Sequence, residues 1–142
     1  MGESLSVDTV VFDSRTPVRL ELRPARDPFG RHELPTWQAR LVGDGLDCFV
    51  VCSEAEWAPR SLADVLGSVS EDSENWPGWD GERVWQSADE VRLAFRHDKA
   101  NTVLVAVVLE VSSGWRCEAE LELSPGVFSY LASEVQRLAQ AR

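Results

Sequence analysis

Cysteine is scarce in this sequence of 142 residues, and its three cysteines are too few, and odd in number, for a disulfide framework. Cys48 and Cys52 lie four residues apart in a strand pattern, which places them about 13 Å apart, too far to share a metal ion. Cys117 alternates with charged neighbours. We therefore expect all three to be buried thiols that behave as small apolar side chains, in a cytoplasmic protein.

Long hydrophobic runs are also missing. The longest, Val103–Leu109, spans seven residues, whereas a membrane-spanning helix needs roughly 20. The N-terminal residues have neither a basic start nor a long apolar segment, so no secretion signal is expected. The sequence predicts no membrane association.

Basic residues are outnumbered, with 14 Lys and Arg against 24 Asp and Glu and a formal net charge of −10. A chain of this charge repels nucleic acids and anionic lipid surfaces. If charge selects a partner, it selects a basic protein.

Catalytic motifs are lacking too. There is no Gly-x-Ser-x-Gly elbow, phosphate-binding glycine loop, His-Glu-x-x-His motif or Cys-x-x-Cys pair. Of the two histidines, His32 lies in a proline-rich loop (Pro24–Pro35) and His97 stands next to Asp98. A hydrolase that uses His97 and Asp98 is a remote alternative, and we expect no catalytic residue, no metal ligand and no cofactor.

Strand patterns fill much of the chain. Apolar residues alternate with polar ones in most of them, whereas Val103–Leu109 is apolar on both faces and predicts a central, covered strand. Gly43-Asp44-Gly45 separates two of the patterns and predicts a hairpin. The expected strands are Thr9–Phe12, Val18–Leu22, Trp37–Val42, Leu46–Cys52, Val91–His97, Val103–Val111 and Trp115–Leu123.

Two helices are expected. Ser61 is a predicted N-cap with Asp64 at the third helical position, followed by an apolar stripe as far as Val69. Ser124-Pro125 begins a C-terminal helix, with serine as N-cap and proline at the first helical position. The fold class is therefore α+β: a mostly antiparallel sheet of six or seven strands, curved or sandwich-like, with one mid-chain and one C-terminal helix. Residues 1–142 form a single domain, with a frayed N-terminus at residues 1–8.

A tryptophan-rich corner, Trp76–Gly81 followed by Trp85, precedes the most apolar strands. Its two Gly-containing turns suit a chain that folds back on itself. The indoles either form an exposed platform for a ligand or partner, beside Arg83, or close one end of the core. Tryptophan is usually largely buried in a domain of this size, which favours the second interpretation.

An acidic stretch, Asp64–Glu90, overlaps this corner and carries eight acidic residues against Arg83 alone. It is either a docking surface for a basic protein or a solvated face that keeps the chain soluble. The candidate partner-binding residues are Glu71, Asp72, Glu74, Trp76, Trp79, Asp80 and Arg83.

The pattern Trp76-x-Gly78-Trp79-x-Gly81-x-Arg83-x-Trp85, followed by two strands and then Trp115, resembles a family of small actinobacterial proteins of unknown function. The order of elements, with the Ser61–Val69 helix ahead of the corner, is also similar to WapI-type immunity proteins, which neutralise contact-dependent toxins. The resemblance implies a cytoplasmic, non-enzymatic protein and supplies no catalytic residues.

Three functional hypotheses follow. The first is a non-enzymatic protein-binding module, immunity-like, that neutralises a bacterial toxin domain through its acidic surface. The second is a small-molecule-binding domain that uses Trp76, Trp79 and Trp85 together with the Pro24–Pro35 loop as pocket walls. The third is the hydrolase.

Overall fold

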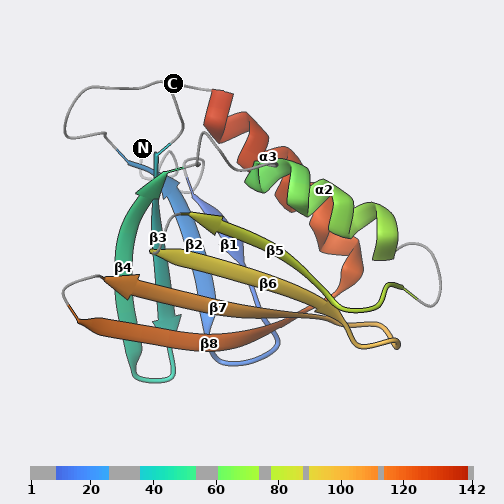
Figure 1. The fold of residues 1–142 in the computed structure, drawn as a ribbon, viewed down its shortest axis with the longest axis horizontal. Helices are drawn as coiled ribbons and strands as arrows, with labels where there is room; N and C mark the ends of the chain where they lie inside the picture. The colour runs from blue at the N-terminus through green and yellow to red at the C-terminus, as the bar shows by residue number, and fades with distance from the viewer. Residues whose placement is uncertain are drawn as a thin grey trace, which may run out of the picture.

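The computed structural model describes residues 9–25, 36–53, 61–73, 78–87, 90–111 and 114–140. Within these residues the secondary structure consists of eight strands, two α-helices and one short 3₁₀ helix. In chain order they are β1 (Val10–Phe12), β2 (Arg19–Pro24), β3 (Thr36–Gly43), β4 (Leu46–Ser53), α2 (Leu62–Ser73), β5 (Glu82–Ser87), β6 (Val91–His97), β7 (Val103–Val111), β8 (Trp115–Leu123), η1 (Pro125–Val127) and α3 (Phe128–Gln140) (Figure 1).

The first four strands form one antiparallel sheet, sheet A, in the order β1-β2-β3-β4. The predicted hairpin is confirmed: Asp44 and Gly45 both have positive φ, and Gly43 pairs with Leu46 across the turn. Positive φ at both central positions gives the turn the twist that antiparallel strands need.

The last four strands form a second antiparallel sheet, sheet B, in the order β5-β6-β7-β8. The α+β class and the antiparallel pairing are confirmed, but the expectation of one six- or seven-stranded sheet is wrong. The chain leaves sheet A after β4, forms α2 and the tryptophan corner, and then starts sheet B. β5 was not expected, because only Trp85 and Ser87 of its six residues are buried and its alternation is weak.

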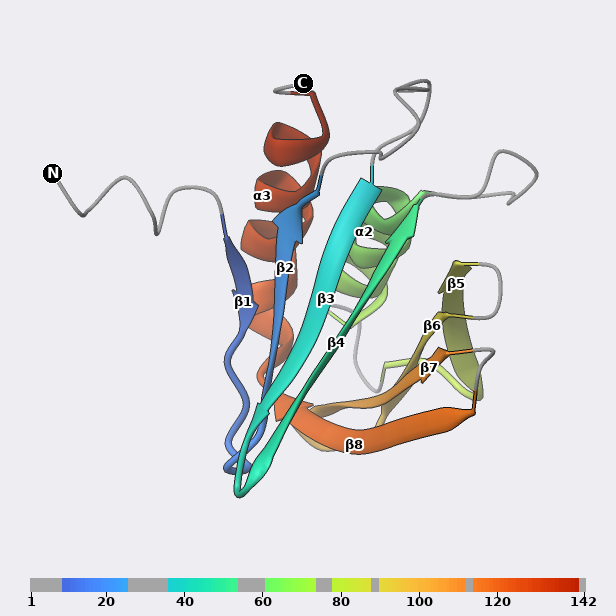
Figure 2. The ribbon, with the colours of Figure 1, turned by 90° about the vertical axis from the view of Figure 1, so that its left-hand side faces the viewer.

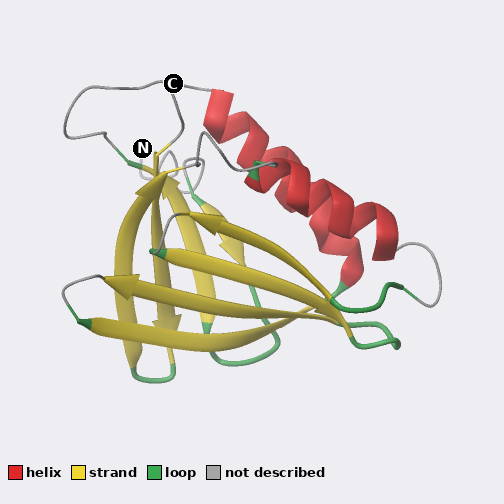
Figure 3. Ribbon diagram, in the orientation of Figure 1, coloured by secondary structure: helices red, strands yellow, loops and turns green. Residues whose placement is uncertain are grey.

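The strands of sheet B run across one end of sheet A, as Figure 2 shows. Both helices lie on the same side of the molecule, next to each other (Figure 3). Helix α2 packs against α3 and β5, and α3 also contacts β1 and β2. The helix pair therefore covers parts of both sheets.

One hydrophobic core joins the two sheets and the helices. It includes Phe12 and Leu41 of sheet A, Leu66 of α2, and Phe95 of sheet B packed edge-to-face on Phe128 of α3, with ring centroids 6.0 Å apart. Every second residue of β7 from Val103 to Leu109 is fully buried in this core, but the residues between them are only half-buried. The expected cover on both faces of β7 is therefore only partial.

The helix N-termini differ from each other. Ser61 is the N-cap of α2: its Oγ accepts a hydrogen bond from the backbone N–H of Asp64 (3.1 Å), as the sequence predicts. Ser124 precedes a 3₁₀ turn rather than α-helix and makes no capping bond through its side chain. Its Oγ instead accepts a hydrogen bond from Arg15 Nη2 (2.8 Å), which ties the β1–β2 connection to the end of sheet B.

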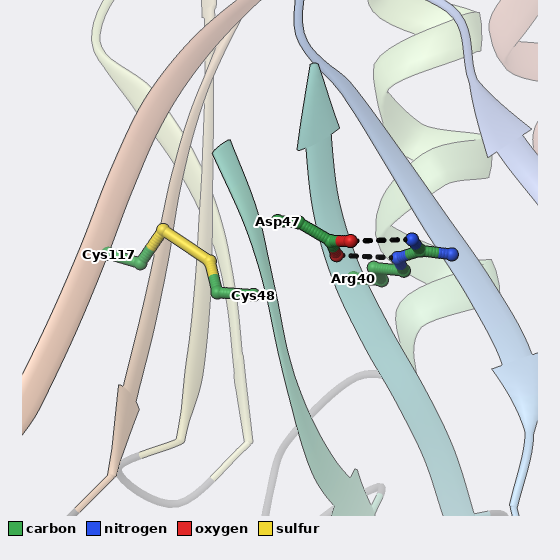
Figure 4. The surroundings of a disulfide bond; sticks show 4 residues. All are labelled: Arg40, Asp47, Cys48 and Cys117. Atoms are coloured by element: carbon green, nitrogen blue, oxygen red, sulfur yellow. Dashed lines mark hydrogen bonds and ion pairs between the residues drawn. A yellow bond between two sulfur atoms is a disulfide. The ribbon is translucent and has the colours of Figure 1, made fainter. Parts of the chain in front are cut away.

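The prediction of three thiols is wrong, because Cys48 of β4 and Cys117 of β8 are joined in a disulfide (Figure 4). The partners lie in different sheets, so strand spacing within either one gave no indication of their proximity. Cys52 is a buried thiol outside this bridge.

Candidate functional site

The tryptophan corner enters sheet B with the indoles of Trp79 and Trp85 turned inward. Trp79 is 7% exposed and Trp85 is 2% exposed, and both belong to the hydrophobic core. Their burial matches the interpretation of the corner as one end of the core. The platform that a small-molecule site would need is therefore not presented by these two rings.

His97, at the end of β6, holds the corner in place. Its imidazole packs edge-on against the Trp79 ring, with centroids 5.3 Å apart. Gly78 has a φ of +92°, and a Cβ at this position would lie 2.4 Å from His97 Nδ1. Only glycine combines this backbone conformation with such close approach to the ring.

The His97-Asp98 pair belongs to the β6–β7 turn. His97 Nδ1 accepts a hydrogen bond from the backbone N–H of Lys99 (2.8 Å), and Lys99 has a positive φ of 69°. Asp98 Oδ1 accepts from the N–H groups of Ala100 (2.8 Å) and Thr102 (3.1 Å). The bond from Ala100 is the main reason that the pKa of Asp98 is lowered. Both side chains therefore accept hydrogen bonds from backbone N–H groups of the turn.

Arg83 connects the corner to helix α2. Its guanidinium carbon lies 5.3 Å from the centroid of the Trp79 ring, a cation–π distance. The same group forms an ion pair with Asp72 and donates a hydrogen bond to Ser68 Oγ (2.6 Å). One arginine therefore fixes the end of α2 over the corner.

Asp80 projects from the corner into solvent and pairs with Lys99. Its Oδ1 lies 2.6 Å from Lys99 Nζ. The hydrogen bond from Lys99 is the main cause of the lowered pKa of Asp80. This pair links the corner to the β6–β7 turn.

A groove with a volume of about 640 Å³ runs between α2 and α3. Small residues from both helices line it, so the two helical backbones are close to its surface. Carboxylates of α2 stand beside them. The lining residues are Ala63, Asp64, Gly67, Ser68, Ser70, Glu71, Asp72, Ser129, Ala132, Ser133 and Gln136.

The candidate residues divide into three groups. Glu71 and Asp72 line the groove. Trp79, Asp80 and Arg83 lie in or next to the corner that supports α2. Glu74 and Trp76 lie outside the described residues, as do His32 and most of the Pro24–Pro35 loop.

The α3 wall of the groove was not anticipated. Its residues Ser129, Ala132, Ser133 and Gln136 recur at helical spacing on one face of α3. The sequence does contain small residues next to the apolar stripe of each helix, and these could have indicated a groove. The sequence alone does not show that the two small-residue faces adjoin.

A family model described as a family of unknown function (DUF6228) matches residues 12–142, which is nearly the whole chain. The chain belongs to this family. The resemblance to a family of unknown function is thus confirmed, while the actinobacterial origin and the similarity to WapI-type immunity proteins stay predictions. No curated protein matches this DUF6228 member.

The described part of the DUF6228 fold contains no helix that is both long and apolar enough for a membrane span. No group of three or more His, Cys, Asp or Glu side chains there could hold a metal ion.

Proposed function

We propose that this chain is a non-enzymatic protein-binding module that docks a basic segment of a partner protein in the groove between α2 and α3. The observation that carries the proposal is the groove itself, which combines a lining of small residues with an acidic rim. Small side chains let an incoming segment approach the helices closely, and carboxylates attract a cationic one. The net charge of −10 acts in the same direction at longer range.

The rim carboxylates are not equivalent. Asp64 and Glu71 are exposed on α2, one near each end of the groove. Asp72 is half-buried and ion-paired with Arg83. Asp64 and Glu71 are therefore the residues we assign to partner attraction, and Asp72 to holding the helix on the corner.

If the partner is a bacterial toxin domain, this binding gives the chain an immunity-like role, in which it neutralises the toxin. This role is supported by the similarity of element order to WapI-type immunity proteins and by the acidic rim. A basic toxin surface that binds nucleic acid would be blocked by such a rim.

The direct test is binding to the polypeptides encoded by the neighbouring genes, expressed and purified one by one. We expect one of them to form a stoichiometric complex and to lose its toxicity on co-expression with this chain. The absence of a complex with every neighbouring toxin would contradict the immunity-like role.

The docking surface is tested by association kinetics with that partner. The double variant Asp64→Lys, Glu71→Lys should slow association about tenfold at low salt and less at high salt, because complementary charge acts mainly on the association rate. The matched control is Asp13→Lys, Glu118→Lys, which makes the same change in net charge at exposed residues that do not line the groove. Equal slowing by both pairs would show that only total charge matters and that the groove is not the site.

A further inference from the structure

Two cysteines separated by 69 positions in the sequence meet where β4 of sheet A passes β8 of sheet B. The sulfur atoms of Cys48 and Cys117 are bonded, and Figure 4 shows the bridge between the two strands. Cys48 is half-buried, whereas Cys117 is buried.

The bridge lies at the junction of the two layers. β4 is the last strand of sheet A and β8 the last strand of sheet B, and every strand pairing among the described residues stays within one sheet. The layers are held by the shared core and by hydrogen bonds such as that from the Glu122 N–H to Ser14 Oγ (2.8 Å). The disulfide adds a covalent bond where no backbone ladder exists.

We propose that Cys48 and Cys117 form a reversible redox pair whose oxidation cross-links sheet A to sheet B. Cys48 is the more exposed residue of the two and is the one that a small thiol or disulfide reaches first, because access governs exchange. The fold holds its partner sulfur in contact. The pair is therefore a modification site for low-molecular-weight disulfides such as glutathione disulfide.

The exchange balances in two steps. The Cys48 thiolate attacks one sulfur of the small disulfide, forms a mixed disulfide and expels one small thiolate. The Cys117 thiolate then attacks the Cys48 sulfur and expels the second. Two protein thiols lose two electrons, the small disulfide gains them, and the two protons leave on the expelled thiols. Excess small thiol reverses both steps.

The oxidised and reduced forms share one fold. Most of the hydrophobic core is formed by side chains other than Cys48 and Cys117, and the hydrogen bond from the Glu122 N–H to Ser14 Oγ involves neither cysteine. Its effect is on stability, since a cross-link between residues 69 apart restricts the unfolded chain. We expect the melting temperature to rise by about 10 °C on oxidation.

Thiol counting tests the chemistry. The full chain is equilibrated with excess reduced glutathione or with excess oxidised glutathione, unfolded in an alkylating reagent, and analysed by peptide mass spectrometry. The expected result is three alkylated cysteines after reduction and only Cys52 alkylated after oxidation. Three alkylated thiols under both conditions, or a bridge that includes Cys52, would overturn the proposal. A bridge that survives excess reduced glutathione would show a permanent bond instead of a reversible pair.

Thermal unfolding under the same two conditions tests the cross-link. Cys117→Ser and Cys48→Ser should each abolish the difference in melting temperature between oxidised and reduced buffers. Cys52→Ala, the control at the cysteine outside the bridge, should retain it. If either serine variant fails to fold, the other variant and the wild-type comparison decide. A wild-type bridge that forms without changing the melting temperature would refute the cross-linking role.

Discussion

Gly78 has no side chain because the imidazole of His97 occupies the space that one would need. The His97 ring in turn packs against Trp79, and its Nδ1 accepts a hydrogen bond from the backbone N–H of Lys99. The corner is thus set by contacts between residues about 20 positions apart in the sequence. The Trp-Pro-Gly-Trp pattern indicates a turn, but it does not indicate that a histidine from the end of β6 fills it.

Replacing Gly78 with alanine should therefore be costly. The positive φ costs about 1 kcal/mol, and displacing the His97 ring adds about 1–3 kcal/mol. We expect Gly78→Ala to lower the free energy of unfolding by about 2–4 kcal/mol in urea titrations. Gly81→Ala is the matched control, because Gly81 also has a positive φ (79°) but no heavy atom lies within 4 Å of the added Cβ. Equal losses in both variants would show that the ring contact contributes nothing.

Asp98 makes stability depend on pH. Its pKa is lowered from 3.8 in the folded chain, chiefly by the N–H of Ala100, so the folded state favours the charged carboxylate. This contribution is fully present above the unfolded value of 3.8 and is lost as pH falls through the lower folded value.

We expect Asp98→Asn to be less stable than the wild type at pH 7, because the amide retains an acceptor oxygen but loses the charge. The difference in the free energy of unfolding should shrink below pH 4 and vanish once the pH has fallen below the lowered folded-state pKa, where the wild-type carboxyl is also neutral. Chemical denaturation across this pH range provides the measurement. A constant difference at all pH values would mean that the shape of the amide, not the lost charge, causes the effect.

The two serines that precede helices, Ser61 and Ser124, accept hydrogen bonds from different parts of the chain. Ser61 Oγ accepts a hydrogen bond from the backbone N–H of Asp64 and so caps α2. Ser124 Oγ instead accepts a hydrogen bond from the guanidinium group of Arg15. Both positions show the same sequence signature of a helix start. The signature cannot distinguish them, because the second hydroxyl is engaged by a residue over 100 positions away.

Ser61→Ala should lower the free energy of unfolding by about 1 kcal/mol, the usual loss for an N-cap. Ser124→Ala should cost about 0.5 kcal/mol, because it removes one exposed hydrogen bond and no cap. Urea titration monitored by far-ultraviolet circular dichroism compares the two. A larger loss at Ser124 than at Ser61 would contradict this assignment of roles.

The local sequence pattern was sufficient to predict seven of the strands and both α-helices, since alternation, a continuous apolar run, a helix N-cap and period-3.6 spacing are all local properties. It was insufficient for β5, where Glu82, Val84 and Gln86 face solvent and only two residues are buried. It also could not divide the strands into two sheets, because pairing patterns do not reveal which strand begins a new layer. The acidic wall of the groove was visible in the sequence, but its α3 wall and the Cys48–Cys117 contact depend on tertiary packing.

The two sheets form separate hydrogen-bonded ladders but share one packed hydrophobic core. No strand pairing among the described residues crosses from sheet A to sheet B, yet one buried cluster includes Trp37 and Trp85 from the two layers. A second connection lies at the β1–β2 segment, where Ser14 Oγ accepts the Glu122 N–H and the Arg15 N–H donates to the Glu122 carbonyl (3.0 Å). Such sharing leads us to expect one cooperative unit, and the single domain stays a prediction.

Equilibrium unfolding in urea under reducing conditions, where no disulfide links the sheets, tests this cooperativity. We expect far-ultraviolet circular dichroism and tryptophan fluorescence to give the same midpoint, because neither sheet can keep its buried face without the other. Trp37→Phe removes the tryptophan of the sheet A strands, and the double variant Trp85→Phe, Trp115→Phe removes both tryptophans of the sheet B strands. In each variant, fluorescence and circular dichroism should still coincide. If each fluorescence midpoint moved away from the circular dichroism midpoint according to which sheet retained its tryptophan, the sheets would be unfolding separately, and the shared core would not be the source of their association.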